Sequence, residues 1–173
     1  MGDTVITLIA IFLAAILMFV FPMMTLSDRN DDVTQLAIQT ETTEFVDNIR
    51  TTGRLTNEEY ENYLDSLNAT GNLYTVELEF RLLDENAGKK TNQANNDRIG
   101  ENEYVSEFTT QIESQLREQG VYTLKEGDIV SVQVKNSSNT LSQTLKNFYF
   151  RIIGNDTYVI AAEHAGIVAV NGK

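Results

Sequence analysis

The segment Val5–Met24 reads VITLIAIFLAAILMFVFPMM and contains no charged residue. About 20 consecutive apolar residues are what an α-helix needs to cross the hydrocarbon core of a bilayer. A cleaved secretory signal would carry Lys or Arg before a shorter apolar region, and a small-x-small cleavage site after it. No basic residue precedes Val5, and Phe21–Met24 offers no such site, so we expect a retained membrane-spanning helix.

The helix is expected to continue far beyond this segment. After the acidic stretch Asp28–Asp32, residues suited to a buried stripe recur at helical spacing: Ile38, Thr42, Phe45, Ile49 and Thr52. Polar residues fill much of the other face: Glu41, Glu44, Asp47 and Asn48. Gly53 is the first helix-stop signal after the proline. We therefore predict one helix from about Asp3 to Thr52, apolar all round in its first half and amphipathic in its second.

Pro22 is the only proline in the chain. A proline inside a helix removes one backbone hydrogen bond and clashes with the preceding turn, so we expect a kink there. The alternative is that Pro22 ends a transmembrane helix and that Thr25–Asp32 is a linker.

A second helix is predicted after Gly53, followed by a strand. Thr56 and Glu59 are spaced as a capping box, in which the hydroxyl and the carboxylate satisfy each other's backbone N–H groups. One apolar face follows and Gly71 ends the helix, the face being formed by Tyr60, Tyr63, Leu64 and Leu67. The strict alternation of apolar and polar residues over Tyr74–Leu82 indicates a strand with one buried face.

The remaining sequence predicts a mixed set of elements. Asp84–Asn102 is typical of an exposed loop, and a helix ending at Gly120 is marked by Tyr104, Val105, Phe108, Ile112 and Leu116. Val130–Val134 alternates as a second strand. Leu141–Ile152 is a short helix or, over 147–153, a strand; a turn at Gly154–Asp156 then leads into a strand or hairpin over Tyr158–Val170.

Helices combined with alternating strands predict an α+β fold: a long N-terminal hydrophobic helix packed on a small domain with an antiparallel sheet. We expect two parts, the long helix over residues 1–53, with its membrane segment at 4–25, and a globular head domain over residues 54–173.

Composition excludes several classes of function. The formal net charge is −12, from 13 Lys and Arg against 25 Asp and Glu, and the only basic run is Lys89–Lys90. Nucleic-acid binding needs clustered basic residues, so we expect no nucleic-acid partner. The absence of cysteine removes disulfides, thiol catalysis and thiolate metal sites.

Candidate chemical groups are few. His164 is the single histidine, so it has no second imidazole for a zinc site and no accompanying nucleophile motif; we expect a structural or solvent-facing role. Asp28–Asp32 offers hard oxygen ligands that suit calcium, but it lacks the glycine and distal glutamate of an EF-hand loop. A solvated acidic collar next to the membrane segment is the favoured interpretation. We expect no catalytic residue, no cofactor and no bound metal.

An uncharged N-terminal helix that continues as an amphipathic helix into an α+β domain resembles the type IV pilins and pilin-like proteins. Three further stretches resemble the tight-adherence (Tad) pilus-type, pilin-like proteins of Gram-positive bacteria: Phe45–Tyr60, Leu64–Tyr74 and Tyr158–Val168. Two features differ from the usual pilin pattern. The glutamate near the start of the mature helix is missing, as is a basic leader before the cleavage site.

The resemblance implies a structural subunit of an extracellular pilus-like filament, made of copies of this chain and built by pilus assembly machinery. The chain would sit in the cell membrane before assembly and on the cell surface afterwards, in an adhesive fimbrium. Pro22 would be the helix kink, and Asp3 would replace the missing glutamate in pairing with a neighbour's N-terminal amine. The filament-core residues would be Val5, Ile6, Leu8, Ile9, Ile11, Phe12, Leu13, Ile16, Leu17, Phe19 and Phe21.

Two alternatives remain at this point. The chain could be a bitopic membrane protein whose extracytoplasmic domain binds a ligand or senses a signal without polymerising. A membrane-tethered hydrolase is less favoured, because His164 would be the only available imidazole base.

Overall fold

A computed structural model describes residues 2–84, 104–138, 143, 144, 147, 151 and 159–172 of the chain. The chain divides into two compact units. One contains Met1–Leu36 and Ser138–Ile160, and the other contains Ala37–Ser137 and Ala161–Lys173. Each unit is described by itself below.

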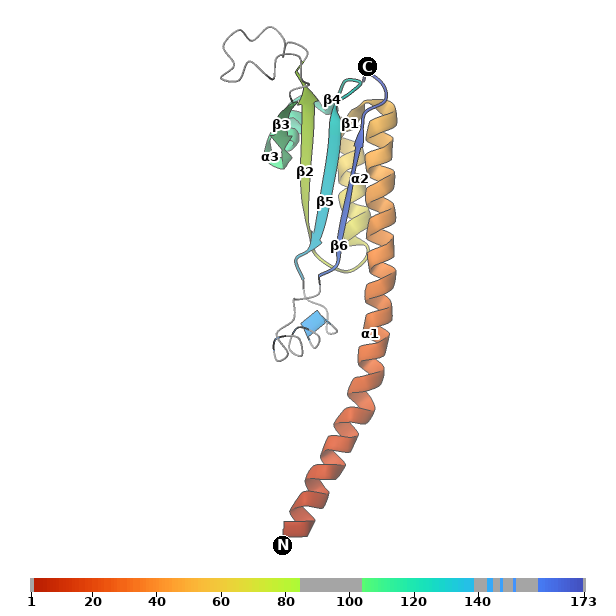
Figure 1. Cartoon of the computed structure of the whole chain (residues 1–173), viewed down its shortest axis with the longest axis vertical. Coiled ribbons are helices and arrows are strands. Elements are labelled where there is room, and N and C mark those ends of the chain that lie inside the picture. Colours follow the sequence, from red (N-terminus) through yellow and green to blue (C-terminus); the bar gives the residue numbers. More distant parts are fainter. Residues whose placement is uncertain are drawn as a thin grey trace, which may run out of the picture. The chain divides into compact units, whose positions relative to one another are not determined.

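Helix α1 spans Gly2–Thr52 without interruption and includes Pro22 (Figure 1). The predicted continuous helix is therefore confirmed, and the alternative with a linker over Thr25–Asp32 is wrong. One turn across the proline, the Thr25 hydroxyl donates to the carbonyl oxygen of Phe21 at 3.0 Å. A proline removes only one N–H donor from a helix, and the regular bonds on both sides maintain the helical path.

The end of α1 is set by Gly53. Its φ of 68° lies in the left-handed region, and its N–H donates to the carbonyl oxygen of Ile49 at 2.8 Å. Strand β1 (Arg54–Thr56) begins immediately afterwards and pairs antiparallel with β4 (Val121–Thr123), which the sequence did not predict. A side chain at residue 53 would collide with the backbone of Val170 and Gly172, so this position needs glycine for space as well as for φ.

The main sheet is antiparallel and has the strand order β3-β2-β5-β6. Its strands are β3 (Tyr104–Phe108), β2 (Tyr74–Leu83), β5 (Ile129–Asn136) and β6 (Ala161–Ile167). The two central strands place their apolar residues on one face, as their alternation predicts: Leu78, Phe80, Val130, Val132 and Val134 are all buried. The fold is α+β, as expected.

One predicted helix begins later than its apolar spacing indicates. Residues 104–108 form strand β3, and α3 starts only at Thr109 and ends at Gln119. The aromatic and β-branched residues of β3 fit a pleated strand, and the edge of β2 supplies the hydrogen bonds that hold it there. The last residue pair between β2 and β3 is Glu79 with Phe108. Beyond it, the N–H of Leu78 donates to the hydroxyl of Thr109, the first residue of α3, at 2.8 Å. This side chain thus takes the place of the next backbone acceptor of β3.

Helix α2 (Asn57–Asn68) begins with the predicted capping box of Thr56 and Glu59. Tyr60, Tyr63 and Leu67 are buried, and the rings of Tyr60 and Tyr63 have their centroids 6.4 and 4.1 Å from that of Phe45 on α1. From α1, the core of the sheet-containing unit receives Ile38, Thr42, Phe45, Val46 and Ile49, all buried. The predicted stripe is therefore confirmed at Ile38, Thr42, Phe45 and Ile49, whereas Thr52 is only half-buried. The stripe anchors the second half of α1 to the sheet domain.

Several predicted elements fall largely outside the described residues. They are the loop over Asp84–Asn102, the turn at Gly154–Asp156 and most of the helix or strand near 141–153. Within the last of these, the described residues Gln143, Thr144, Asn147 and Arg151 are helical. The described part of Tyr158–Val170 contains a single strand, β6. The predicted domain division at residue 53 stays a prediction.

Edge strand β6 is tied to α1 by an arginine clamp, defined here as Arg50 with its partners Asp47 and Ile167. The Arg50 guanidinium donates to Asp47 Oδ1 at 2.6 Å and, through Nε, to the carbonyl oxygen of Ile167 at 3.0 Å. The arginine lies directly over Gly166, where a Cβ would overlap its guanidinium and stem. A glycine in a strand interior commonly marks such a close approach.

Gly166→Ala should therefore lower stability, although replacing glycine in a strand by alanine usually raises it. Overlap with Arg50 should cost on the order of 1–3 kcal/mol, read as a lower midpoint of thermal or urea unfolding. The matched control is the double-mutant cycle with Arg50→Ala. The second substitution removes the obstacle, so the alanine at 166 should cost much less in that background. Equal costs in both backgrounds would contradict the clamp.

Candidate functional site

The eleven predicted core residues of α1 all lie on open surface. Their exposed fractions run from 43% for Ile16 to 70% for Phe19, so no side of this segment is covered by the rest of the chain. Among the described residues, α1 is the one helix long and apolar enough to cross a membrane, and its apolar stretch is entirely unburied. Such a helix is compatible with a transmembrane helix and weakly indicates membrane association.

The polar groups of this segment are satisfied within the helix. The Thr7 hydroxyl donates to the carbonyl oxygen of Asp3 at 2.7 Å, as that of Thr25 does to Phe21. An apolar environment supplies no other partners, so internal bonding of this kind is a requirement there. Asp3 lies in the first turn, where its carboxylate is favoured by the free N–H groups. Whether it pairs with a neighbour's amine stays a prediction.

The acidic stretch Asp28–Asp32 distributes its carboxylates around α1. Asp31 is buried at 1% exposure, Asp28 is half-buried and Asp32 is exposed. Within the described part of the chain, no three acidic or histidine side chains are grouped so as to hold a metal ion. The predicted exposed acidic collar therefore applies to Asp32 but not to Asp31, which is buried by the chain itself.

His164 lies on β6 beside the arginine clamp. Its Nε2 is 3.7 Å from Asp47 Oδ1, the same oxygen that Arg50 binds. Val132 is its cross-strand partner on β5. These contacts favour the structural role expected from the sequence.

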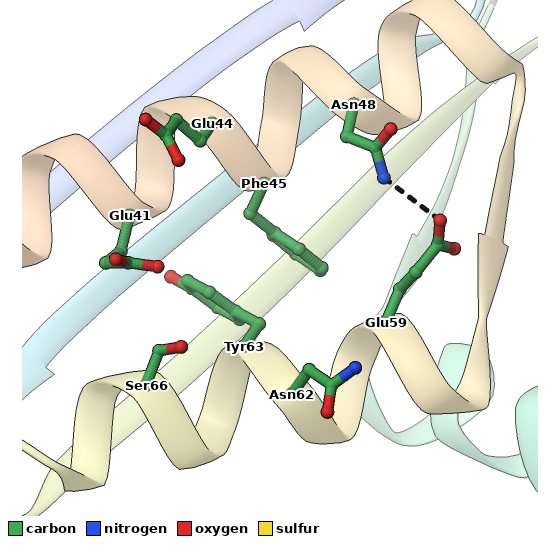
Figure 2. A pocket seen from close by; sticks show the side chains of 8 residues that line it. All are labelled: Glu41, Glu44, Phe45, Asn48, Glu59, Asn62, Tyr63 and Ser66. Atoms are coloured by element: carbon green, nitrogen blue, oxygen red, sulfur yellow. Dashed lines mark hydrogen bonds between the residues drawn. The ribbon is translucent and has the colours of Figure 1, made fainter.

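A groove lies between α1 and α2 in the sheet-containing unit (Figure 2). Its floor is an aromatic pair, Phe45 and Tyr63, stacked with ring centroids 4.1 Å apart and planes 3° from parallel. The Tyr63 hydroxyl lies 2.9 Å from the Thr42 hydroxyl. The rim is polar and contains three carboxylates; it is formed by Glu41, Glu44, Asn48, Glu59, Asn62 and Ser66.

The surroundings of Tyr63 and Glu59 shift the pKa of each side chain. Burial raises the pKa of Tyr63 to about 12; the bond with Thr42 opposes the shift and the nearby Glu41 carboxylate adds to it. Burial would raise the pKa of Glu59, but hydrogen bonds from Thr56 and Asn48 outweigh it and hold the pKa below its usual value. A negative rim above two stacked rings suits a cationic group.

Sequence reasoning did not find this groove. It placed Glu41, Glu44 and Asn48 on the polar face of one helix and the Glu59 carboxylate in a cap, without bringing the two helices together. The bond from Asn48 Nδ2 to Glu59 Oε1, 3.0 Å long, joins them (Figure 2). Only the pairing of α1 with α2 in three dimensions reveals the site, and no spacing within either segment encodes it.

Comparison with known proteins adds no assignment: no protein-family model matches the chain, and no curated protein or solved structure matches it either. Function is therefore inferred from the geometry of α1 and of the head domain.

The capping carboxylate makes acid stability a test of this region. Because the pKa of Glu59 is lower in the folded chain than its ordinary value of 4.5, its contribution is present above about pH 4.5 and is lost as the pH falls through the folded value. Glu59→Gln should be less stable than the parent chain at pH 6 by about 1 kcal/mol, because the neutral amide can still cap the helix but accepts weaker hydrogen bonds than the carboxylate. The difference should shrink towards pH 3, as followed by urea unfolding. Glu58→Gln, on the exposed side of the same turn, is the matched control, and equal behaviour of the two variants would contradict the cap.

Proposed function

We propose that this chain is a structural subunit of an extracellular type IV pilus-like filament, held together by packing of α1 from neighbouring copies. The observation that carries the proposal is the division of α1: residues 37–52 are committed to the head domain, whereas Val5–Met24 is apolar on every side and exposed on every side. Such a segment needs an apolar environment, and lipid and other copies of α1 both provide one.

The difference between lipid and a filament core as surroundings for α1 explains why membrane storage would come before assembly. Lipid tails are as apolar as Leu, so moving the helix from membrane to filament gains little from the hydrophobic effect. Extraction therefore needs work from an assembly machinery, which we propose as a partner. Once the helix is outside the membrane, it is either packed against other helices or exposed to water. Packing is then favoured by roughly 25 cal/mol per Å² of apolar area removed from water.

The assembly geometry follows from having one such helix per copy. Packing side by side with a displacement along the axis gives a heterologous contact that does not close, and so an open helical fibre. The head domains, with 18 Asp and Glu against 11 Lys and Arg over residues 54–173, carry a net charge of −7 and would coat the outside and keep the fibre soluble. The chain would be stored in the cell membrane and then displayed on the cell surface, where adhesion is a role open to it.

A structural role is also favoured over catalysis. His164, the only histidine, has its Nε2 3.7 Å from Asp47 Oδ1, an oxygen that already binds Arg50. The groove over Phe45 and Tyr63 contains carboxylates and amides but no imidazole. We accordingly propose that the chain is not an enzyme.

The second candidate is a bitopic membrane protein whose head binds a ligand without polymerising. The observation that favours it is the groove between α1 and α2, with its acidic rim and stacked aromatic floor. It requires saturable binding of a small cation by the full chain in detergent micelles, and a chain that stays monomeric when lipid is removed.

Ile9→Lys and Leu13→Glu should each sharply reduce the number of fibres on cells, because a charge would be buried in the filament core. Both side chains are exposed in the single chain, at 59% and 57%, so the head should still fold. The measurement is fibre counting by electron microscopy, with the membrane-bound pool quantified by antibody to the head. Ile9→Val and Leu13→Met are the matched controls and should keep fibre formation. Fibre numbers at the parental level in the charged variants would contradict the proposal.

A further inference from the structure

Exposed apolar side chains continue along α1 beyond the membrane-length segment. Leu26, Val33 and Leu36 are 67%, 68% and 65% exposed, and the charged stretch Asp28–Asp32 lies between the first two of them. They are spaced by seven and three residues, which places them on one side of a helix.

The same spacing extends back through the apolar segment as a heptad pattern. The a positions are Val5, Phe12, Phe19, Leu26 and Val33, and the d positions are Leu8, Ala15, Pro22, Arg29 and Leu36. We call this set the a/d stripe. Nine of its ten members are apolar or proline, and the acids Asp28, Asp31 and Asp32 all fall off it. In the charged section, a face free of acidic residues, with Arg29 as its one charged member, therefore stays in register with the apolar helix.

Between Leu26 and Leu36, the side of α1 opposite the stripe is buried. Asp31 is 1% exposed and Thr34 is 6% exposed. At about 100° per residue, Asp31 lies about 140° around the helix from both Leu26 and Leu36. The buried and the exposed sides are thus nearly opposite, and the described residues leave the stripe open.

Lipid is a poor occupant for the upper part of the stripe. Val5–Met24 already spans about 30 Å at 1.5 Å per residue, which is the thickness of a hydrocarbon core. Leu36 lies about 18 Å further along the axis. Asp28, Arg29 and Asp32 stand between them and would resist entry into lipid.

We infer that the stripe from Leu26 to Leu36 is a contact surface for α1 of a second copy, so that the packing between copies extends beyond the apolar segment. This inference rests on the proposed filament and names the face of α1 that the copies use. A heptad stripe fits best against a helix with the same repeat, and this chain supplies that helix itself.

Charge supports the same occupant. Arg29 is the only basic residue before Arg50, and it is exposed at a d position of the stripe. Every other charged residue before Glu41 is acidic, so a second copy of α1 offers Arg29 an anionic surface to face. Thr40 and Thr43 continue the heptad as polar residues and mark where the apolar contact ends.

The chain contains no cysteine, so a single introduced thiol reports its own surroundings without interference. The test compares Val33→Cys with its neighbour Asp32→Cys, which lies at the same height but about 100° around the helix. Each full-length variant is treated, under reducing conditions, with a water-soluble maleimide in membranes and in sheared, assembled fibres. We expect Val33→Cys to be labelled in membranes and at least tenfold more slowly in fibres. Asp32→Cys should be labelled in both states with a much smaller change.

Three results would overturn the inference. Fibres in which both positions react equally would show that the stripe is not a contact, while leaving the filament proposal intact. Protection of Val33→Cys already in membranes would assign the stripe to lipid. Absence of fibres from the parent chain would remove the filament proposal, and the inference with it. Loss of fibres in Val33→Cys alone would instead support the stripe.

Discussion

Helix α1 is uninterrupted, but its two halves have different surroundings. Its backbone N–H and C=O groups have to be hydrogen-bonded in both. In the first half no polar partner is expected outside the helix, so even the hydroxyls of Thr7 and Thr25 bond to carbonyl oxygens one turn back. In the second half a sheet and a second helix cover one side, and specific contacts become available. Helix continuity through Pro22 joins these two halves mechanically.

The contacts at the head end show how firmly the second half is held. The stacked pair of Phe45 and Tyr63 joins α1 to α2, and the arginine clamp joins α1 to β6. Gly53 then turns the chain directly into the β1–β4 ribbon. A load on the apolar half would thus be transmitted into the sheet domain through several elements, which suits a subunit in a fibre.

The sequence allowed the long helix, the capping box at Thr56 and the central strands β2 and β5 to be predicted, because each depends on periodicity or on a local bond. It did not allow β3 to be recognised, since Tyr104, Val105 and Phe108 fit a helical face equally well and only the free edge of β2 decides between the two. The short β1–β4 pair and the groove between α1 and α2 depend on contacts between distant segments. Leu26, Val33 and Leu36 lie on either side of the charged stretch Asp28–Asp32, and only their exposure in the folded chain distinguishes them as a surface.

The central claim is that α1 leaves the membrane to form the core of a fibre. The most direct measurement is electron microscopy of material sheared from the surface of cells that make this chain, labelled with antibody to the head domain. The account predicts thin fibres labelled along their whole length and absent from cells that lack the chain. Unlabelled fibres that persist without the chain, together with purified protein that stays monomeric in micelles and after detergent removal, would contradict it.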